Sequence, residues 1–242
     1  MRFRLETRPF PAPRYLALWI CRFIVVSMFL SAAASQVAAQ APPAPAARFV
    51  VLLDAAHGGS DAGGRLGDMT EKAFTLALSV RLRSLLSARG FQVVTTREQD
   101  ATFELNRRAE IANRANAQAC LSLHGSESGS GVHLFTSSLA PAPFTRFAAW
   151  KTAQAGWVTR SLALAGVINS ALVHAEMAVT LDRTTLPGVD SMTCPAVAVE
   201  IAPERDADHK ITADLDNPDY QAHVAEALAA ALLQWRTEAR QP

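Results

Sequence analysis

The sequence lacks several features that would assign it to particular protein classes. Only three of its 242 residues are cysteines, and it has no paired Cys-x-x-C motifs of the kind that form structural zinc sites. It also lacks the His-Glu-x-x-His motif that many zinc proteases carry on a helix. Beyond residue 39 no apolar run approaches the roughly 20 residues that a membrane-spanning helix needs.

The first 39 residues have the composition of a secretory leader. Four arginines precede residue 15, an apolar stretch covers 23–30, and Val37-Ala38-Ala39 offers small residues for cleavage before Gln40. Arg22 shortens the uncharged run to about 13 residues, too few to span a bilayer. We therefore expect a signal peptide at 1–39 and a periplasmic protein. The alternative is an uncleaved leader, which would be the chain's only contact with the membrane.

Neither sign of charge dominates the chain, which has 23 basic and 22 acidic side chains. Residues 1–39 hold five arginines and one glutamate, so their removal leaves 18 basic and 21 acidic groups, a net charge near −3. Proteins that bind nucleic acid usually carry a basic surface. The balance therefore argues against nucleic acid as a partner.

The remainder is long enough for one domain with a substantial core. Residues 40–47, QAPPAPAA, are predicted to form a Pro/Ala tether, and 48–241 to form the folded domain. Cys120 and Cys194 both lie near the starts of predicted strands. We favour two buried thiols that behave as small hydrophobic groups, with one disulfide as the alternative in an exported protein.

Hydrophobic periodicity predicts strands that alternate with helices. Strands are expected at 48–53, 91–96, 119–123, 131–136 and 195–201. Helices are expected at 71–89, at 105–117, in two pieces within 144–175, and at 220–239, with 178–194 irregular. This alternation predicts a single three-layer α/β domain, in which helices cover both faces of a mostly parallel or mixed twisted sheet.

Four polar residues are expected at the edge where such sheets carry their sites, the carboxyl ends of the strands. His57 follows the first strand in VLLDAAHGGSD, His124 ends the third, and Glu200 lies near the end of the fifth. Glu71 opens the first helix. Two imidazoles and a carboxylate are typical ligands of catalytic zinc, although spacing alone leaves ordinary structural roles as an alternative.

Several linked motifs between residues 50 and 200 resemble one family, the zinc-dependent N-acetylmuramoyl-L-alanine amidases of the Amidase_3 group, which hydrolyse peptidoglycan. LLDAAHGGSDAGG is similar to the family motif that follows its first strand, and the strand 195–200 is similar to the one that bears its catalytic glutamate. The other matching elements are Glu71-Lys72, Thr96-Arg97, Leu105 with Arg108, Ala112-Asn113 and Ser122-Leu123-His124.

The resemblance implies one Zn²⁺ per chain, held by His57, Glu71 and His124, with Glu200 as the catalytic acid/base. It implies cleavage of the amide between the lactyl group of N-acetylmuramic acid and L-alanine, with peptidoglycan as the partner. The alternatives are a non-catalytic peptidoglycan-binding or regulatory domain of the same fold, and a zinc peptidase that acts on a different amide.

The chain departs from the family pattern in three places. Ala55-Ala56 replaces Pro-Gly before the first histidine, Asp190 stands near the place of an arginine, and 201–204 replaces a Gly-Phe pair and an Asn-containing turn. None of these changes removes an implied zinc ligand. They place substrate orientation and rate in question, and they motivate the non-catalytic alternative.

Further residues have open roles. Asp54 is a candidate to orient His57, because metal-bound imidazoles usually have such a partner, and a solvated Asp is the alternative. Glu127 is a second candidate for the cleft, and His133 is expected to be structural. Trp150 and Trp157 lie seven residues apart near 144–176, a stretch that we expect to be core or, alternatively, a lid helix on which an activator protein acts.

Overall fold

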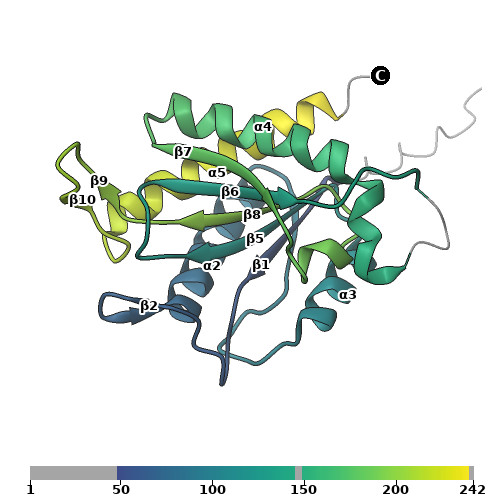
Figure 1. Cartoon of the computed structure of the whole chain (residues 1–242), viewed down its shortest axis with the longest axis horizontal. Helices are drawn as coiled ribbons and strands as arrows, with labels where there is room; N and C mark the ends of the chain where they lie inside the picture. The colour runs from purple at the N-terminus through teal and green to yellow at the C-terminus, as the bar shows by residue number, and fades with distance from the viewer. Residues whose placement is uncertain (1–47, 145–148, 240–242) are drawn as a thin grey trace, which may run out of the picture. The chain divides into compact units, whose positions relative to one another are not determined.

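The strand that leads into His57 belongs to a mixed sheet of six strands (Figure 1). The computed structural model describes residues 48–144 and 149–239. The strand order is β4-β1-β5-β8-β6-β7. β1 pairs in parallel with β4 and β5, β5 pairs in parallel with β8, and β6 is antiparallel to β8 but parallel to β7. The strands are β1 (Val50–Ala55), β4 (Gln92–Thr95), β5 (Ala119–Gly125), β6 (Val132–Ser137), β7 (Val179–Thr184) and β8 (Ala196–Ile201).

Helices cover both faces of this sheet, which confirms the predicted α/β class. Figure 1 views the sheet from the side of α3 (Leu105–Ala115), with α2 (Glu71–Ala88) and α5 (Pro218–Glu238) behind it. α4 (Val158–His174) joins α2 and α5 in the larger hydrophobic core. The smaller core lies on the other face, beneath α3 and the 3₁₀ turn η2 (Val189–Ser191). Two short hairpins complete the fold: β2 (Arg65–Leu66) with β3 (Met69–Thr70), and β9 (Glu204–Arg205) with β10 (Ile211–Ala213).

The main elements follow from the sequence pattern. β1 is apolar on successive residues because both of its faces are buried, as in parallel sheets with helices on both sides. α2 buries Phe74, Leu78, Leu82 and Leu86, which are spaced four residues apart and so share one side of the helix. α5 begins where the side chain of Asn217 accepts hydrogen bonds from the backbone of the first turn.

β7 is a strand that the sequence did not predict, since we expected residues 178–194 to be irregular. It lies at the edge of the sheet, and five of its six residues are exposed. An exposed edge strand has no need for the apolar run or the alternation from which strands are recognised. The later part of the segment is irregular as expected, apart from η2.

Cys120 and Cys194 form a disulfide, so the expectation of two free thiols was wrong. Their Cα atoms are 6.3 Å apart. β5 and β8 are neighbours, with Cys120 in register opposite Ala196, and this brings Cys194 next to Cys120. The bridge closes a segment with a sequence separation of 74 residues.

The helical region after residue 144 is in two pieces, as predicted. A 3₁₀ segment, η1 (Trp150–Gly156), precedes α4, and the two axes are bent by 66°. Trp150 is the first residue of η1 and Trp157 stands at the bend before α4, so the two do not lie on one regular α-helix. Together the pieces have the length and hydropathy of a broken membrane span, whereas no single helix among the described residues is long and apolar enough to cross one.

α4 lies on the face of the sheet opposite the predicted site. Leu164, Ile168 and Leu172 are fully buried in the larger core with Val199 of β8. Glu200, the next residue along β8, points to the other face. α4 therefore does not cover the site in this structure. The predicted signal peptide at 1–39 and tether at 40–47 lie outside the described residues.

Candidate metal centre and cleft

Three of the predicted site residues converge at the carboxyl ends of the strands. His57 follows β1, Glu71 is the first residue of α2, and His124 lies in β5. One ligand atom from each lies within 4.8 Å of the other two. Nε2 of His57 is 3.0 Å from Oε2 of Glu71, and Nδ1 of His124 is 3.0 Å from Oε1. The carboxylate thus lies between two imidazoles whose ring planes are nearly perpendicular, at 87°.

The glycines after His57 let the chain fold back closely over this group. His57 itself has a φ of 61°, in the left-handed region that residues with side chains rarely adopt. Gly63 has a φ of 66°, and a Cβ there would lie 2.6 Å from the His57 ring and 2.7 Å from the Glu71 carboxylate. Only glycine fits at this position, because the two side chains occupy the space.

Glu71 is held as an anion in a buried position. Burial raises the pKa of its carboxyl group, but the hydrogen bond to His124, the Gly64 N–H and the two imidazoles together lower that pKa to about 2. The N–H groups of Gly64 and Gly125 lie 2.8 and 3.2 Å from its oxygens. The start of α2 is therefore fixed, and Glu71 is ionised at neutral pH.

Asp61, rather than the expected Asp54, is the direct partner of His57. Oδ2 of Asp61 lies 2.8 Å from Nδ1 of the ring, and this hydrogen bond is the main cause of the lowered pKa of Asp61. Asp54 is buried among Thr96, Ser122 and Arg108. It reaches His57 only through Arg108, which donates to both Asp54 and the carbonyl oxygen of His57.

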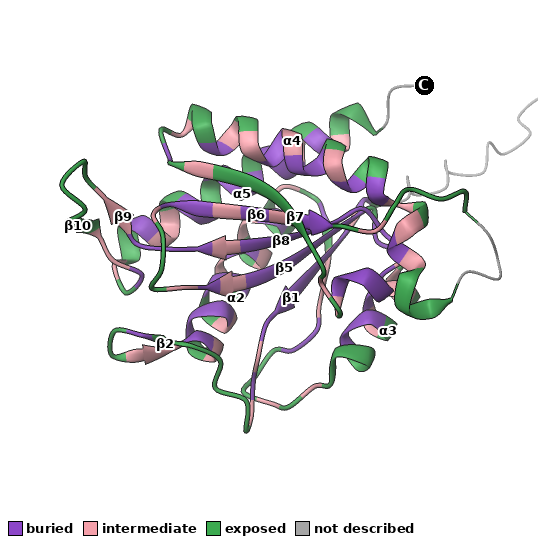
Figure 2. Cartoon of the chain, in the orientation of Figure 1, coloured by how far each residue is buried: buried purple, intermediate pink, exposed green. Residues whose placement is uncertain are grey.

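Glu200 lies next to His124, on the neighbouring strand. The two residues are register partners across β5 and β8, and His133 of β6 is the register partner of Glu200 on its other side. Figure 2 shows a patch of intermediate burial near the carboxyl ends of β5 and β8, where His124 and Glu200 are each intermediate in burial. No described residue donates a hydrogen bond to the Glu200 carboxylate. Nδ1 of His133 lies 2.7 Å from Oγ1 of Thr180 on β7, a hydrogen bond in keeping with a structural role.

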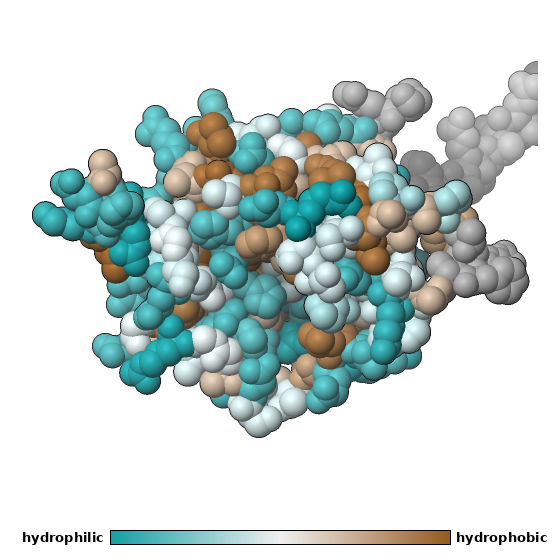
Figure 3. Space-filling model, viewed as in Figure 1, coloured by the Kyte–Doolittle hydropathy of each residue, from teal (hydrophilic) through white to brown (hydrophobic). Residues whose placement is uncertain are grey.

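A cleft of about 310 Å³ opens beside the two histidines. One wall is polar and includes His57, Asp61 and His124. The lining also has an apolar part, here called the apolar wall, which comes from the loops that lead into α3 and η2 and from the first residues of these elements: Phe103, Leu105, Leu186, Pro187 and Val189. Figure 3 shows this side of the molecule as mainly hydrophilic, with hydrophobic residues in small separate groups.

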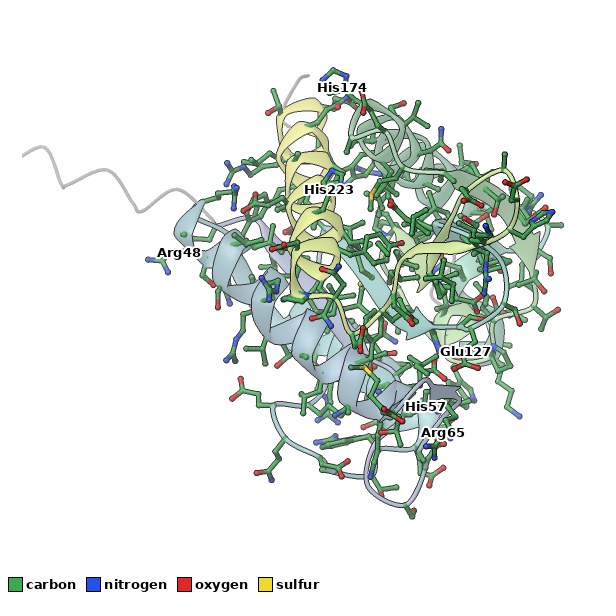
Figure 4. The ribbon with its side chains drawn as sticks, turned by 90° about the vertical axis from the view of Figure 1, so that its left-hand side faces the viewer. Arg48, His57, Arg65, Glu127, His174 and His223 are labelled. Atoms are coloured by element: carbon green, nitrogen blue, oxygen red, sulfur yellow. A yellow bond between two sulfur atoms is a disulfide. The ribbon has the colours of Figure 1, made fainter. Side chains whose placement is uncertain are left out.

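The remaining candidates lie elsewhere or have structural contacts. In Figure 4 His57, Arg65 and Glu127 lie toward one end of the molecule, whereas His174, the last residue of α4, and His223 of α5 lie away from them. Glu127 accepts a hydrogen bond from the Gly67 N–H and does not line the cleft. Asp190 is buried and accepts from the Leu186 N–H, so it braces the loop that forms the apolar wall.

The donor set of His57, Glu71 and His124 fits a metal ion. Two imidazole nitrogens and a carboxylate oxygen suit zinc, and catalytic zinc sites keep three protein ligands and an open position. The open cleft lies directly beside these residues. The described structure thus contains an α/β sheet with a His-Glu-His group that could bind a metal at the carboxyl ends of its strands.

Comparison with known protein families shows to which family the chain belongs. The Amidase_3 family, N-acetylmuramoyl-L-alanine amidase, matches residues 51–234. The chain therefore belongs to the N-acetylmuramoyl-L-alanine amidase family. Its match to the germination-specific N-acetylmuramoyl-L-alanine amidase of Bacillus subtilis (strain 168) is 30% identical over 94 residues, which are 33% of this chain and 40% of that protein. In three curated relatives the matched part spans 28%, 40% and 39% of the relative's length.

Solved structures share the fold over most of the chain. The catalytic domain of CwlV, an N-acetylmuramoyl-L-alanine amidase from Bacillus (Paenibacillus) polymyxa var. colistinus, is 25% identical with a TM-score of 0.61, covering 78% of this chain and 98% of that domain. The CwlD amidase from Clostridioides difficile, solved in complex with the GerS lipoprotein, has a TM-score of 0.58 at 19% identity, covering 79% of this chain and 100% of that one.

Proposed function

We propose that the protein is a zinc-dependent N-acetylmuramoyl-L-alanine amidase. It hydrolyses the amide between the lactyl group of N-acetylmuramic acid and the L-alanine of the stem peptide in peptidoglycan. The observation that carries this proposal is the convergence of His57, Glu71 and His124, of which the two histidines line an open cleft. Glu200 is the register partner of His124 on the neighbouring strand. Membership of the amidase family supports the choice of bond.

In this proposal each residue of the site has one task. His57, Glu71 and His124 would hold one Zn²⁺ per chain through Nε2, a carboxylate oxygen and Nδ1. The ion would supply Lewis acidity toward the amide carbonyl and lower the pKa of water toward neutrality. Glu200 accepts the proton of the attacking water on its carboxylate and then delivers a proton to the leaving amine. The half-buried position of Glu200, free of partners among the described residues, supports this role.

The cellular location forms part of the same proposal. A signal peptide at 1–39 and a tether at 40–47 would deliver the domain to the periplasm, where peptidoglycan lies. The disulfide between Cys120 and Cys194 supports export, because such bonds persist in oxidising compartments. An activator protein stays a prediction. Since α4 lies on the opposite face of the sheet, such a partner would act by some route other than removing α4 from the cleft.

The alternative is a domain that binds peptidoglycan without cleaving it. Its motivation was the change at Asp190 and at 201–204. Asp190 braces its own loop and does not line the cleft, so the substitution leaves the polar wall intact. The amidase is therefore the better supported of the two.

The test uses protein that lacks only residues 1–39, since all described strands and both hydrophobic cores lie within 48–239. Bound zinc is quantified, and soluble products from peptidoglycan are identified by mass spectrometry. We expect about one zinc per chain and release of free stem peptides. Zinc without products would support the binding domain, cleaved cross-links would indicate a peptidase, and absence of zinc would refute the ligand assignment.

A further inference from the structure

Two buried arginines hold the backbone that leads into His57. The carbonyl oxygen of Ala55 accepts from Nε of Arg97 at 3.0 Å and from Arg108 at 2.6 Å. The next carbonyl, of Ala56, accepts from Arg97 at 3.0 Å, and that of His57 accepts from Arg108. Both arginines are only 3% exposed. Three consecutive carbonyls at the exit of β1 are thus held by two guanidinium groups.

Arg97 also reaches the helix that begins with Glu71. Its guanidinium donates to the carbonyl of Lys72 at 2.7 Å and to the hydroxyl of Thr75 at 3.1 Å. The Thr75 hydroxyl in turn donates to the carbonyl of Ala56 at 2.8 Å. One guanidinium therefore connects the segment before His57 to the first turn of α2, and so connects the segments that carry two of the three candidate ligands.

Arg108 is fixed by a buried ion pair with Asp54, at 2.6 Å. The Asp54 carboxylate also accepts from Thr96 at 2.8 Å and from Ser122 at 3.0 Å. Buried ion pairs are tolerated where such additional hydrogen bonds satisfy the charges. Arg108 further donates to the carbonyl of Phe103, at the base of the apolar wall.

Burying the two charged guanidinium groups costs free energy, which suggests that they fix the position of this backbone segment. Burial is the main cause that lowers the pKa of Arg97, and the charge of the neighbouring Arg108 adds to it. Carbonyls at a strand exit can be satisfied by water, which costs no buried charge. Here they flank His57, whose left-handed conformation has to be maintained by its surroundings.

We propose that Arg97 and Arg108 are positioning residues that fix His57 relative to Glu71 before the metal ion binds. This role rests on the proposed function. The two guanidiniums preorganise the ligand set through the main chain, whereas Asp61 orients the His57 ring through its side chain. Metal affinity, rather than folding alone, is the property that they control.

The test compares Arg97→Lys and Arg108→Lys with Arg107→Lys. Lysine keeps the charge but cannot supply several hydrogen bonds in the planar geometry of a guanidinium. Arg107 is the matched control, because it is half-exposed on α3 and pairs with Glu110. Zinc dissociation constants are measured by competition with a chelator, on metal-free protein whose folding is verified by circular dichroism. We expect about tenfold or greater weakening in the first two variants, the size typical of groups that orient metal ligands, and parent-like affinity in the third.

The outcomes separate this role from the function on which it rests. Absence of zinc binding by the parent protein overturns both. Equal affinity in the parent and all folded variants, or an equal loss in Arg107→Lys, overturns the positioning role alone. If the lysine variants do not fold, zinc binding by Thr75→Val tests the positioning role instead. This change removes the hydroxyl that bonds to both Arg97 and the Ala56 carbonyl, and it leaves no buried charge unpaired. Weaker zinc binding by folded Thr75→Val supports the role, and parent-like affinity overturns it.

Discussion

The imidazole of His57 is held between two carboxylates, one on each nitrogen. Nδ1 lies 2.8 Å from Oδ2 of Asp61, and Nε2 lies 3.0 Å from Oε2 of Glu71. A neutral imidazole has one nitrogen that donates and one that accepts or binds metal. The lowered pKa of Asp61 keeps it an anion at neutral pH. In the proposed zinc site, Asp61 would accept the Nδ1 proton of His57 and leave Nε2 to face the metal.

Replacement of Asp61 by alanine should therefore weaken zinc binding. We expect the dissociation constant to rise by about 10- to 100-fold, the usual effect of removing a partner of a metal-bound histidine. Asp61 is largely exposed, so the melting temperature of the metal-free protein should change little. Chelator competition and thermal unfolding measure the two quantities, with Asp208→Asn on the β9–β10 hairpin, which does not line the cleft, as control. Unchanged zinc affinity would show that Asp61 does not set the tautomer.

Replacement of Glu200 by glutamine should separate catalysis from metal binding. The amide has nearly the same shape but cannot accept the proton of water, so release of stem peptides should fall by about 100- to 10,000-fold. Zinc content should stay at the parent level, because Glu200 is not one of the three ligands. The comparison is Glu127→Gln, since Glu127 bonds to the Gly67 N–H outside the cleft. Parent-like release by Glu200→Gln would disprove the assigned role.

The sequence predicted where the candidate residues lie when that position follows from one strand or one helix start. His57, His124 and Glu200 each follow or end an apolar run, and parallel strands bring their carboxyl ends to one edge. That reasoning needs only the local hydrophobic pattern and the rule that sites in such sheets lie at the carboxyl ends of the strands. It brought His57, Glu71 and His124 together, as the structure does, even though the exposed and polar strand β7 went unrecognised.

Features that depend on strand order or loop path were not predictable in the same way. The disulfide requires β5 and β8 to be neighbours, and no local pattern specifies that order. The choice of Asp61 over Asp54 as partner of His57 depends on a loop that turns back through glycines with positive φ. The carbonyl contacts of Arg97 and Arg108 depend on three segments packing together, although both residues had already been noted within the family motifs.

Loss of the disulfide should destabilise the fold and leave the metal set in place. Closing a loop of 74 residues is worth about 4 kcal/mol of unfolding free energy in the chain-entropy account. Urea unfolding of the Cys120→Ala/Cys194→Ala variant should show most of this loss, and a reducing agent should destabilise the parent similarly but not the variant. Zinc affinity of the folded variant should be unchanged, because the bridge lies at the opposite ends of β5 and β8 from His124 and Glu200. A parent protein insensitive to reduction would contradict the prediction.

Leu105 should contribute to substrate binding rather than to folding. It is 52% exposed, lines the cleft, and lies so close to Gly188 that a Cβ there would be 3.3 Å from its Cδ2. The contact joins the two loops of the apolar wall. Truncation by Leu105→Ala removes apolar surface worth about 1 kcal/mol of binding, so KM for a soluble muropeptide should rise roughly fivefold while the melting temperature stays near that of the parent.

The matched control for Leu105 is Leu181→Ala. Leu181 is 41% exposed, and its register partner Leu134 belongs to the larger core, so Leu181 faces the side of the sheet away from the cleft. A raised KM in Leu105→Ala alone would assign the apolar wall to the substrate. An unchanged KM, or the same rise in both variants, would show that the wall does not contact the substrate. Because the two leucines have similar exposure, a general effect of removing surface leucine would appear equally in both.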